Sequence, residues 1–231
     1  MKGFHYALGL IATMAAILIF LITSFEIGAY SDFNWYQKEY AKYGVLDELK
    51  MEMEDTMNVT YEMMDYLRGD REDLVVKTVV NGVEREFFND REKAHMVDVR
   101  NLFLGGLDLR RGSAVTLVIA ILLLVFTKAD WKKILPKSFV IGLGAFIALI
   151  VIFALLCVSD FTKYFTLFHE IFFDNDLWLL NPRTDLLIRM LPEGFFFDMV
   201  GRISRIFVGF LAVSLGGSLL WLKKTENKKN L

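Results

Sequence analysis

The sequence predicts a mainly α-helical membrane protein, with four transmembrane helices and an extracytoplasmic α+β cap formed by two outer loops. Of its 231 residues, 55% are apolar and 14% are aromatic, which is too apolar for an ordinary soluble domain. The apolar residues gather in four segments, and lysine-rich stretches lie beside alternate ends of these segments. Together these observations predict a multi-pass protein of the cell membrane.

The predicted spans differ in length. A helix needs about 20 apolar residues to cross a bilayer, and the second segment is shorter, so it relies on tilt or on flanking basic side chains that reach the interface. The first segment is interpreted as an uncleaved anchor, because no small-x-small cleavage site follows it. The four spans are Tyr6–Ala29, Ser113–Thr127, Phe139–Val158 and Ile203–Leu222.

Lysines next to the spans predict the orientation. Cytoplasmic segments of membrane proteins are enriched in lysine and arginine close to the spans. Both termini and the turn between the second and third spans are therefore expected in the cytoplasm, and residues 30–112 and 159–202 outside. The chain then divides into 1–30, 31–112, 113–158, 159–202 and 203–231. The lysines are Lys2, Lys128, Lys132, Lys133, Lys137, Lys223, Lys224, Lys228 and Lys229.

The first outer loop has the pattern of a small α+β domain. Leu74–Val80 and Val83–Phe88 are rich in β-branched and aromatic residues, and Asn81-Gly82 between them favours a two-residue type I′ turn, which predicts a β-hairpin. Upstream, apolar residues at helical spacing predict one helix, and a second short helix is expected to end near Leu67. The first helix is indicated by Leu46, Leu49, Met53 and Met57.

A capping signal predicts the helix that carries His95. Asn89 followed three residues later by Glu92 resembles a capping box, which would open a helix containing His95. A straight helix from His95 into the second span would hold the imidazole far from the bilayer at about 1.5 Å per residue. We therefore expect the chain to break and fold back, laying His95 near the interface, at glycines that disfavour helix: Gly105, Gly106 and Gly112.

The second outer loop predicts an amphipathic interfacial helix over Phe161–Phe173. Its apolar residues share one face, Lys163 and Glu170 lie opposite, and His169 falls at the edge of the apolar stripe. Trp178 and the Phe195-Phe196-Phe197 run before the fourth span are typical interface anchors.

His95 and His169 are the candidate catalytic residues. Imidazole titrates near neutral pH, so two histidines in the outer loops can move protons where membrane lipids and lipid-anchored chains are in reach. A structural role for each histidine stays open. Asp98 follows His95 by one helical turn, so it either fixes the imidazole tautomer or forms an ordinary surface pair.

Other site classes lack their sequence signals. The chain has no His-x-x-His, His-Glu-x-x-His or paired cysteine pattern, no Gly-x-Ser-x-Gly elbow, no Walker loop and no dinucleotide fingerprint. We therefore expect no metal and no cofactor. Nucleic acid is not an expected partner, because membrane topology already explains the positive charge.

Several short stretches, in order along nearly the whole chain, resemble the bacterial family of integral membrane lipoprotein intramolecular transacylases. The four-span layout with two outer loops matches the family as well. The stretches are Asn34-Trp35-Tyr36, Glu39-Tyr40, Tyr43-Gly44-Val45, Glu92 to Phe103 around Ala94-His95-Met96-Val97-Asp98-Val99, Phe168-His169-Glu170-Ile171-Phe172-Phe173, Trp178, Asn181-Pro182, Asp185, Pro192-Glu193 and Phe196-Phe197.

The resemblance implies a specific reaction at the extracytoplasmic face. The family acts on lipoproteins whose N-terminal cysteine carries a diacylglyceryl thioether, and it moves the sn-2 acyl chain to the α-amino group of that cysteine. By the same resemblance, His95 and His169 match the family's two essential histidines. The implied partners are a diacylglyceryl-modified lipoprotein and membrane lipid.

Transfer of an acyl group from an ester to an amine is downhill and needs proton transfer and donors for the oxyanion. The sequence leaves open which histidine is the base. Two alternatives also stay open, namely a non-enzymatic lipid- or protein-binding envelope protein and a lipid esterase. The candidate donors, which the sequence does not rank, are Asn175, Asn181, Arg183, Arg202 and Arg205.

Overall fold

The structure is a computed structural model that describes residues 2–157 and 161–227 and the side chains of all of these except 150–157, 161 and 162. The chain forms two compact units. The helical unit comprises Met1–Phe25, Leu107–Phe161 and Ser204–Leu231, and the mixed unit comprises Glu26–Gly106 and Thr162–Ile203. The fold is mainly helical, as the composition predicts.

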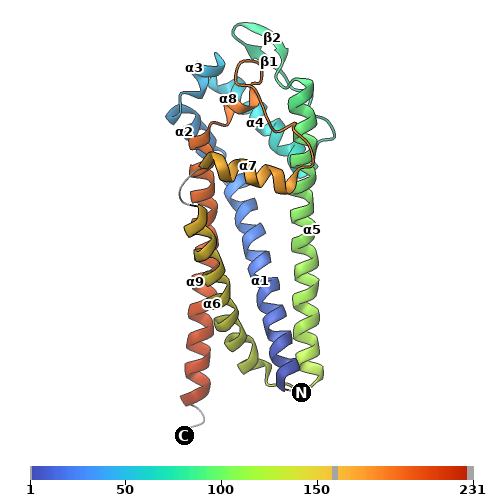
Figure 1. The fold of residues 1–231 in the computed structure, drawn as a ribbon, viewed down its shortest axis with the longest axis vertical. Coiled ribbons are helices and arrows are strands. Elements are labelled where there is room, and N and C mark those ends of the chain that lie inside the picture. The colour runs from blue at the N-terminus through green and yellow to red at the C-terminus, as the bar shows by residue number, and fades with distance from the viewer. Residues whose placement is uncertain (1, 158–160, 228–231) are drawn as a thin grey trace. The chain divides into compact units, whose positions relative to one another are not determined.

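The helical unit contains long stretches of α1 (Lys2–Tyr30), α5 (Asp90–Phe126), α6 (Trp131–Cys157) and α9 (Glu193–Asn227). Within this unit, α1, α5 and α9 run alongside one another (Figure 1). Among the described residues, these three helices are long and apolar enough to cross a membrane. They contain the first and fourth predicted spans and all of the second except Thr127, which follows the end of α5. The remaining span, Phe139–Val158, lies in α6 and ends at a residue outside those described.

Small residues bring α1 and α6 together. A Cβ atom on Gly9 would lie 2.3 Å from Ser138 Oγ, and one on Gly142 would lie 2.8 Å from Thr13 Cγ2. Helices in lipid associate through such close backbone contact, because the apolar solvent provides no hydrophobic driving force between them. A larger side chain at either glycine would separate the two helices. Large residues fill the space beyond this contact, with a buried cluster of Ile17, Phe139, Leu143 and Leu211.

The mixed unit has a dense core beneath short elements. These elements are α2 (Asn34–Lys42), α3 (Val45–Leu49), α4 (Met53–Arg68), β1 (Lys77–Val80), β2 (Val83–Glu86), α7 (Phe161–Phe172) and α8 (Leu187–Met190). Tyr40 at the core centre is fully buried, and its hydroxyl forms a 2.9 Å hydrogen bond with Thr60 Oγ1, so that hydroxyl is not buried without a partner. The most buried large residues of this core include Tyr40, Leu49, Phe87, Phe88 and Met190.

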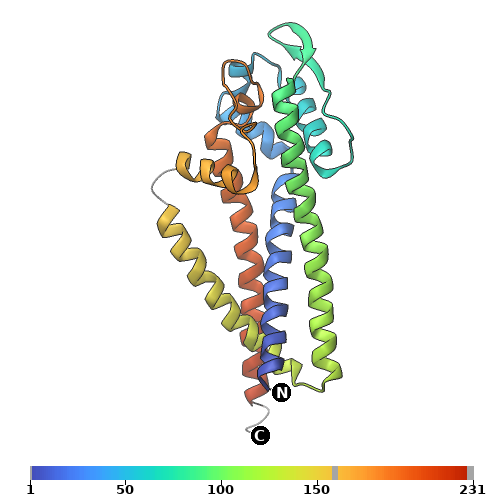
Figure 2. The same cartoon turned by 45° about the vertical axis from the view of Figure 1, so that its right-hand side comes forward.

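The predicted β-hairpin is confirmed. β1 and β2 pair antiparallel with Val80 opposite Val83 (Figure 2). Asn81 and Gly82 have φ angles of 53° and 76°, and positive φ at both central residues is the type I′ geometry that Asn-Gly favours. The strands are shorter than predicted and end at Glu86. Phe87 N still donates to the Val76 carbonyl at 2.8 Å, and the Phe87 and Phe88 side chains are buried in the core.

The helix predicted around Leu46–Met57 is divided in two. Lys50 adopts a left-handed conformation with φ of 56° and ends α3, and α4 starts afresh at Met53. Both helices bury apolar residues in one core, including Leu49 and Met57. The apolar spacing therefore identified the buried face correctly but missed the turn, since local backbone conformation does not alter that spacing.

The predicted break before the second span is wrong. α5 is a single helix from Asp90 to Phe126 and passes through Gly105, Gly106 and Gly112 without interruption. A glycine in a helix interior costs only about 1 kcal/mol, and the apolar residues that follow favour a continuous hydrogen-bonded backbone. His95 thus lies in the second turn of the same helix that carries the second predicted span.

Candidate active site

His95 is held at the capped N-terminus of α5. The predicted capping box is confirmed, since Asn89 N donates to Glu92 Oε2 at 2.8 Å and Glu92 N donates to Asn89 Oδ1 at 2.9 Å. Glu92 is fully buried, and its second oxygen accepts a 2.6 Å hydrogen bond from Leu187 N at the start of α8. These bonds fix the first turn of α5 and hence the starting point of the His95 side chain.

His169 lies in the last turn of α7, the amphipathic helix that the sequence predicts. Glu170 is exposed, as expected, and so are Phe168 and Ile171, whereas His169 is only 7% exposed. His169 Nδ1 lies 2.6 Å from the Phe165 carbonyl oxygen one turn earlier. A carbonyl oxygen can only accept, so Nδ1 carries the proton and the neutral ring presents Nε2 as its basic nitrogen.

The structure brings the two candidate histidines together. The ring centroids of His95 and His169 lie 6.0 Å apart, with 36° between the ring planes. The two imidazoles thus converge, although α5 and α7 lie far apart in the sequence. Both histidines are 7% exposed. At this separation one reacting group placed between the rings can contact both of them.

Aromatic side chains enclose the pair. Trp178 stacks on His169 with ring centroids 4.8 Å apart, and Phe165 lies 4.1 Å from the same ring. Phe173 contacts both imidazoles, at 5.5 Å from each. The surroundings are thus apolar and suited to an acyl chain rather than to a highly hydrated substrate.

Two polar contacts tie the loop after α7 to α5 on either side of His95. Asn175 Nδ2 donates to Asp98 Oδ2 at 2.8 Å, one turn after His95. Arg91, one turn before His95, donates to the Asp176 carbonyl and lies 3.5 Å from the Asp176 carboxylate. The loop that leads from His169 to Trp178 is thereby anchored on both sides of His95.

Burial lowers the pKa of both imidazoles. The pKa of His95 falls from 6.5 to about 4, chiefly because burial disfavours the charged ring and secondly because of His169, while Asp98 opposes the shift. Burial also lowers the pKa of His169, and the Phe165 carbonyl partly restores it. Both rings are therefore neutral at pH 7 and able to accept a proton.

Asp98 is part of this network through Asn175. Among the described residues, no atom forms a hydrogen bond with His95 Nδ1, which is buried. The tautomer-fixing contact considered for Asp98 is consequently absent at that nitrogen. Asp98 instead anchors Asn175, whose Oδ1 also accepts from Leu177 N at 3.0 Å.

The other predicted donors lie elsewhere. Asn181 shapes a turn, since its Oδ1 accepts from the backbone N of the exposed Arg183 at 3.0 Å. Arg202 lies over the Trp35 ring at 5.1 Å and donates to Ser31 Oγ at 3.3 Å. Arg205 is exposed and belongs to the helical unit, whereas both histidines belong to the mixed unit. Of the candidates, only Asp98 and Asn175 have contacts beside the pair.

The contact of Trp178 with His169 was not predicted. The sequence indicates Trp178 only as an interface anchor, and no spacing rule connects it to a histidine on a preceding helix. The described residues contain no group of three or more histidine, cysteine or acidic side chains that could hold a metal ion.

Comparisons with known proteins agree with this architecture. The family model described as "Lipoprotein intramolecular transacylase Lit" matches residues 10–196. The solved structure of such a transacylase from Bacillus cereus superposes with a TM-score of 0.76 at 20% identity, covering 98% of this chain and 99% of that one. A comparison with curated proteins gave no significant match.

Two variants of the same Bacillus cereus protein superpose as well. The variant in which a histidine is changed to arginine gives a TM-score of 0.73 at 19% identity and covers 98% of this chain and 96% of that one. The variant in which a histidine is changed to alanine gives a TM-score of 0.75 at 20% identity and covers 97% of this chain and 96% of that one. These identities establish a common fold, and the family match adds the class of reaction.

Proposed function

The chain belongs to the lipoprotein intramolecular transacylase family, and we propose that it moves the sn-2 acyl chain of a diacylglyceryl group to the α-amino group of the same lipoprotein's N-terminal cysteine. It is an acyltransferase that acts on lipoproteins. The product of the proposed reaction is a lyso lipoprotein with one amide-linked chain and one ester-linked chain. Its atoms are those of the substrate, so no acyl donor or cofactor is consumed.

The observation that carries the proposed site is the pair of buried imidazoles, His95 and His169, with ring centroids 6.0 Å apart. Two neutral bases beside one reacting centre match the two proton transfers that the reaction requires. Aromatic rings around the pair favour an acyl ester, and the exposed apolar side chains of α7, Phe168, Ile171 and Phe172, favour a lipid surface nearby.

We assign the base to His169. Its Nδ1 proton is committed to the Phe165 carbonyl, so Nε2 accepts the proton that the α-ammonium of the cysteine must lose. The carbonyl then stabilises the imidazolium, because a hydrogen bond to the charged form favours it. The free amine attacks the ester carbonyl carbon and forms the C–N bond of a tetrahedral intermediate.

We assign His95 to the departing oxygen. As the intermediate collapses, the bond between the acyl carbon and the glycerol oxygen breaks, and that oxygen receives a proton. The His169 imidazolium first releases its proton to water. His95 then takes the second proton from the attacking nitrogen and gives it to the departing oxygen, so the amide nitrogen is neutral and both rings end neutral. A charge on either ring disfavours a charge on the other, so the pair holds one mobile proton at a time.

Positioning supplies much of the remaining rate. Nucleophile and ester belong to one molecule, and holding them in contact converts the attack into an oriented unimolecular step that lowers the barrier by several kcal/mol. The anchored loop between His169 and Trp178 keeps the two rings in place during this step. Asn175 and Asp98 act here as positioning residues.

The proposed setting is a bilayer crossed by four helices. The three helices long and apolar enough to span, together with α6, give the four-span layout, and residues of the mixed unit form the extracytoplasmic cap. The lysines beside the second-to-third turn and in the C-terminal tail support cytoplasmic termini. The histidines would then lie on the extracytoplasmic side, where the exposed apolar side chains of α7, and not a break in α5, would bring the pair to the lipid surface. Nucleic acid has no role in this proposal.

Mass spectrometry of lipoprotein N-terminal peptides tests the reaction. The chain is expressed in a bacterium that makes diacyl lipoproteins, and the expected product is a fatty amide on cysteine with a monoacyl glyceryl group at unchanged total mass. Loss of one acyl chain would identify an esterase. Unmodified diacyl peptides, from cells in which the full chain is present in the membrane, would overturn the proposal.

Histidine variants test the site separately. His95→Ala and His169→Ala should each abolish conversion while the protein accumulates to the wild-type level. His5→Ala, which changes the third histidine in the helical unit, is the matched control and should keep full conversion. Activity of either His95→Ala or His169→Ala near the wild-type level would remove that residue from the proposed mechanism.

Cysteine labelling tests the orientation. After Cys157→Ser, a single cysteine is placed at the exposed positions Asp70 or Asp174, or at the exposed positions Lys133 or Lys224. A membrane-impermeant maleimide should label the first two in intact cells and the last two only after permeabilisation. The reverse pattern would place the mixed unit in the cytoplasm and refute the proposed orientation.

A further inference from the structure

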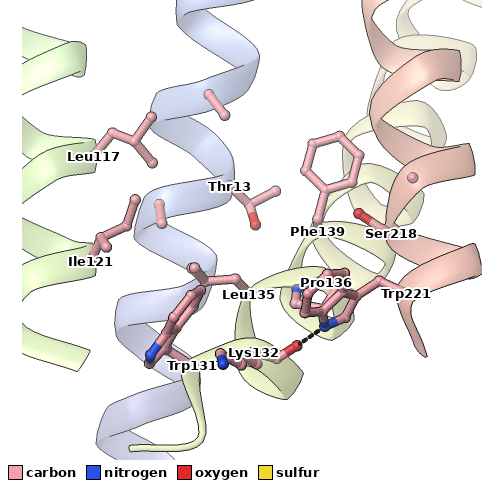
Figure 3. A pocket seen from close by; sticks show the side chains of 13 residues that line it. Thr13, Leu117, Ile121, Trp131, Lys132, Leu135, Pro136, Phe139, Ser218 and Trp221 are labelled. Atoms are coloured by element: carbon pink, nitrogen blue, oxygen red, sulfur yellow. Dashed lines mark hydrogen bonds between the residues drawn. The ribbon is translucent and has the colours of Figure 1, made fainter. Parts of the chain in front are cut away.

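The helical unit contains an apolar groove that the acyl transfer does not use. Its volume is about 410 Å³, within the range of small-ligand pockets, and α1, α5, α6 and α9 all contribute to its walls. Figure 3 shows Thr13 from α1, Leu117 from α5, Phe139 from α6 and Trp221 from α9 around it. All of the lining residues belong to the helical unit, whereas His95 and His169 belong to the mixed unit.

Small residues make the space. Ala12, Ala16 and Gly217 line the groove, and a Cβ atom on Gly217 would meet nothing within 4 Å. Thr13 also lines the groove, and its hydroxyl donates a hydrogen bond to the Gly9 carbonyl at 2.9 Å. A wall of this kind offers an acyl chain dispersion contacts and offers water few hydrogen bonds, so a hydrocarbon chain fits it better than water does.

The groove has a cationic end. Lys132 lines it, with Nζ 5.5 Å from the Trp131 ring, and Trp221 Nε1 donates to the Lys132 carbonyl at 2.8 Å, which ties α9 to the start of α6. Residues 128–137 and 223–226 hold six lysines and two acids, a net charge of +4. Two tryptophans beside lysines are typical of the level of lipid headgroups.

We propose that this groove binds an anionic glycerophospholipid, with one acyl chain along the apolar wall and the phosphate at Lys132. Charge complementarity selects the anionic class, since lysines close to a membrane surface attract acidic lipids and a zwitterionic headgroup gains little from a net charge of +4. The lipid bridges α6 and α9 beside the hydrogen bond that Trp221 Nε1 donates to the Lys132 carbonyl. The inference rests on the proposed membrane placement of these helices and is independent of the acyl transfer.

Retention of defined lipids tests the site. The full chain is reconstituted into vesicles of equal parts phosphatidylglycerol and phosphatidylethanolamine and purified in mild detergent, and the lipid bound per protein is counted by native mass spectrometry. Wild-type protein should retain more phosphatidylglycerol than phosphatidylethanolamine. Gly217→Phe should reduce the retained amount about fivefold or more, because the ring occupies the groove.

Neighbouring positions supply the controls. A Cβ on Gly216 also meets nothing within 4 Å, and Gly216 does not line the groove, so Gly216→Phe should retain lipid like wild type. Lys132→Gln should lower the preference for phosphatidylglycerol about fivefold, and Lys133→Gln, which does not line the groove, should lower it less. Equal retention by both phenylalanine variants, equal loss in both, or no lipid preference in wild type would each overturn the site.

The lipid count does not depend on catalysis. Conversion of lipoprotein by Gly217→Phe is measured in parallel, so loss of lipid retention with intact conversion, or the reverse, separates a failure of the groove from a failure of the proposed reaction. If Gly217→Phe does not accumulate in the membrane, the loss of phosphatidylglycerol preference in Lys132→Gln becomes the test of the site. That change removes a charge and adds no bulk to the groove.

Discussion

At His169, one backbone contact determines which ring nitrogen can act. The Phe165 carbonyl holds the Nδ1 proton, so Nε2 is left as the basic nitrogen and the ring cannot turn without losing a hydrogen bond. Among the residues that the structure describes, His95 has no such partner at its buried Nδ1. The two rings therefore differ in character although they share one aromatic enclosure, and this difference supports the assignment of His169 as the base.

The first prediction concerns pH and His95. Its pKa is about 4 in the folded protein and near 6.5 in the unfolded chain, so between these values the unfolded chain binds more protons. The stability contributed by this group is fully present above pH 6.5, and it is lost as the pH falls toward 4. Denaturant unfolding from pH 7.5 to 4 should show a steeper loss for wild type than for His95→Gln, and parallel curves would contradict the shifted pKa.

The second prediction concerns Trp178, which stacks on His169 at 4.8 Å. Trp178→Ala should lower kcat about tenfold to a hundredfold, since a small misplacement of a catalytic group has effects of that size. Trp178→Phe keeps an aromatic surface and should stay within a few-fold of wild type. Leu179→Ala, at an exposed neighbour, is the control. Equal rates for Trp178→Ala and wild type would show that the stacking does not position His169.

At the scale of the element, α5 and the loop after α7 form the frame of the site. The capping box at Asn89 and Glu92 fixes the start of α5, and the contacts of Arg91 and Asp98 fix the loop against it. The positions of the two histidines therefore depend on polar contacts that are partly exposed. Such contacts contribute modestly to stability, so their loss should be visible in activity before it is visible in folding.

The third prediction is that Asp98 and Asn175 act as a unit. If Asp98 serves only to anchor Asn175, then Asp98→Ala, Asn175→Ala and the double variant should all lower kcat by a similar factor, with strong non-additivity in the double-mutant cycle. If Asp98 instead acts on His95 directly, Asp98→Ala should cost clearly more than Asn175→Ala. Measured rates for the three variants distinguish the two roles.

The fourth prediction concerns the glycines of α5. Cβ atoms at Gly105 and Gly106 would meet nothing within 4 Å, so alanine at each should stabilise the protein by about 0.5–1 kcal/mol by favouring the helix. Gly82→Ala should destabilise it, because the φ angle of Gly82 is +76°. Thermal unfolding of the three variants in one detergent gives the comparison, and destabilisation by Gly105→Ala would contradict a continuous α5.

Local rules could predict much of this fold, and long-range packing accounts for what they missed. Asn81-Gly82 predicts the hairpin and the Asn89–Glu92 spacing predicts a capped helix, because each depends on neighbouring residues alone. The break expected at Gly105 was wrong, since the helix preference of the whole segment outweighs single glycines. The stacking of Trp178 on His169 was unpredictable for a different reason, as it depends on how a loop returns to a helix.

At the scale of the whole molecule, the site combines segments that no local pattern connects. The sequence indicates His95 and His169 as chemical groups, but their separation of 6.0 Å between ring centroids arises only when the mixed unit folds. The helical unit is built differently. Glycines allow α1 and α6 to approach closely, and apolar side chains such as Phe126 and Val213 remain exposed. That surface suits lipid as the solvent.

The last prediction concerns whether the acyl chain passes through an acyl-enzyme. Two neutral imidazoles with ring centroids 6.0 Å apart can serve the proton transfers without carrying the acyl group themselves. The acyl chain should then pass directly from oxygen to nitrogen within one substrate molecule. Cys157→Ser should convert at the wild-type rate, which separates this route from one through the single thiol.

A crossover experiment checks this directly. Two synthetic diacylglyceryl lipopeptides of different peptide mass, one with deuterated acyl chains, are mixed with the purified protein, and the N-acyl products are separated by mass. Direct transfer gives each peptide only its own chains, at any ratio of the two substrates, and dilution of one substrate leaves its fractional conversion rate unchanged below saturation. Mixed products would require an acyl-enzyme or direct transfer between two lipopeptide molecules, and either result would contradict transfer within one substrate molecule.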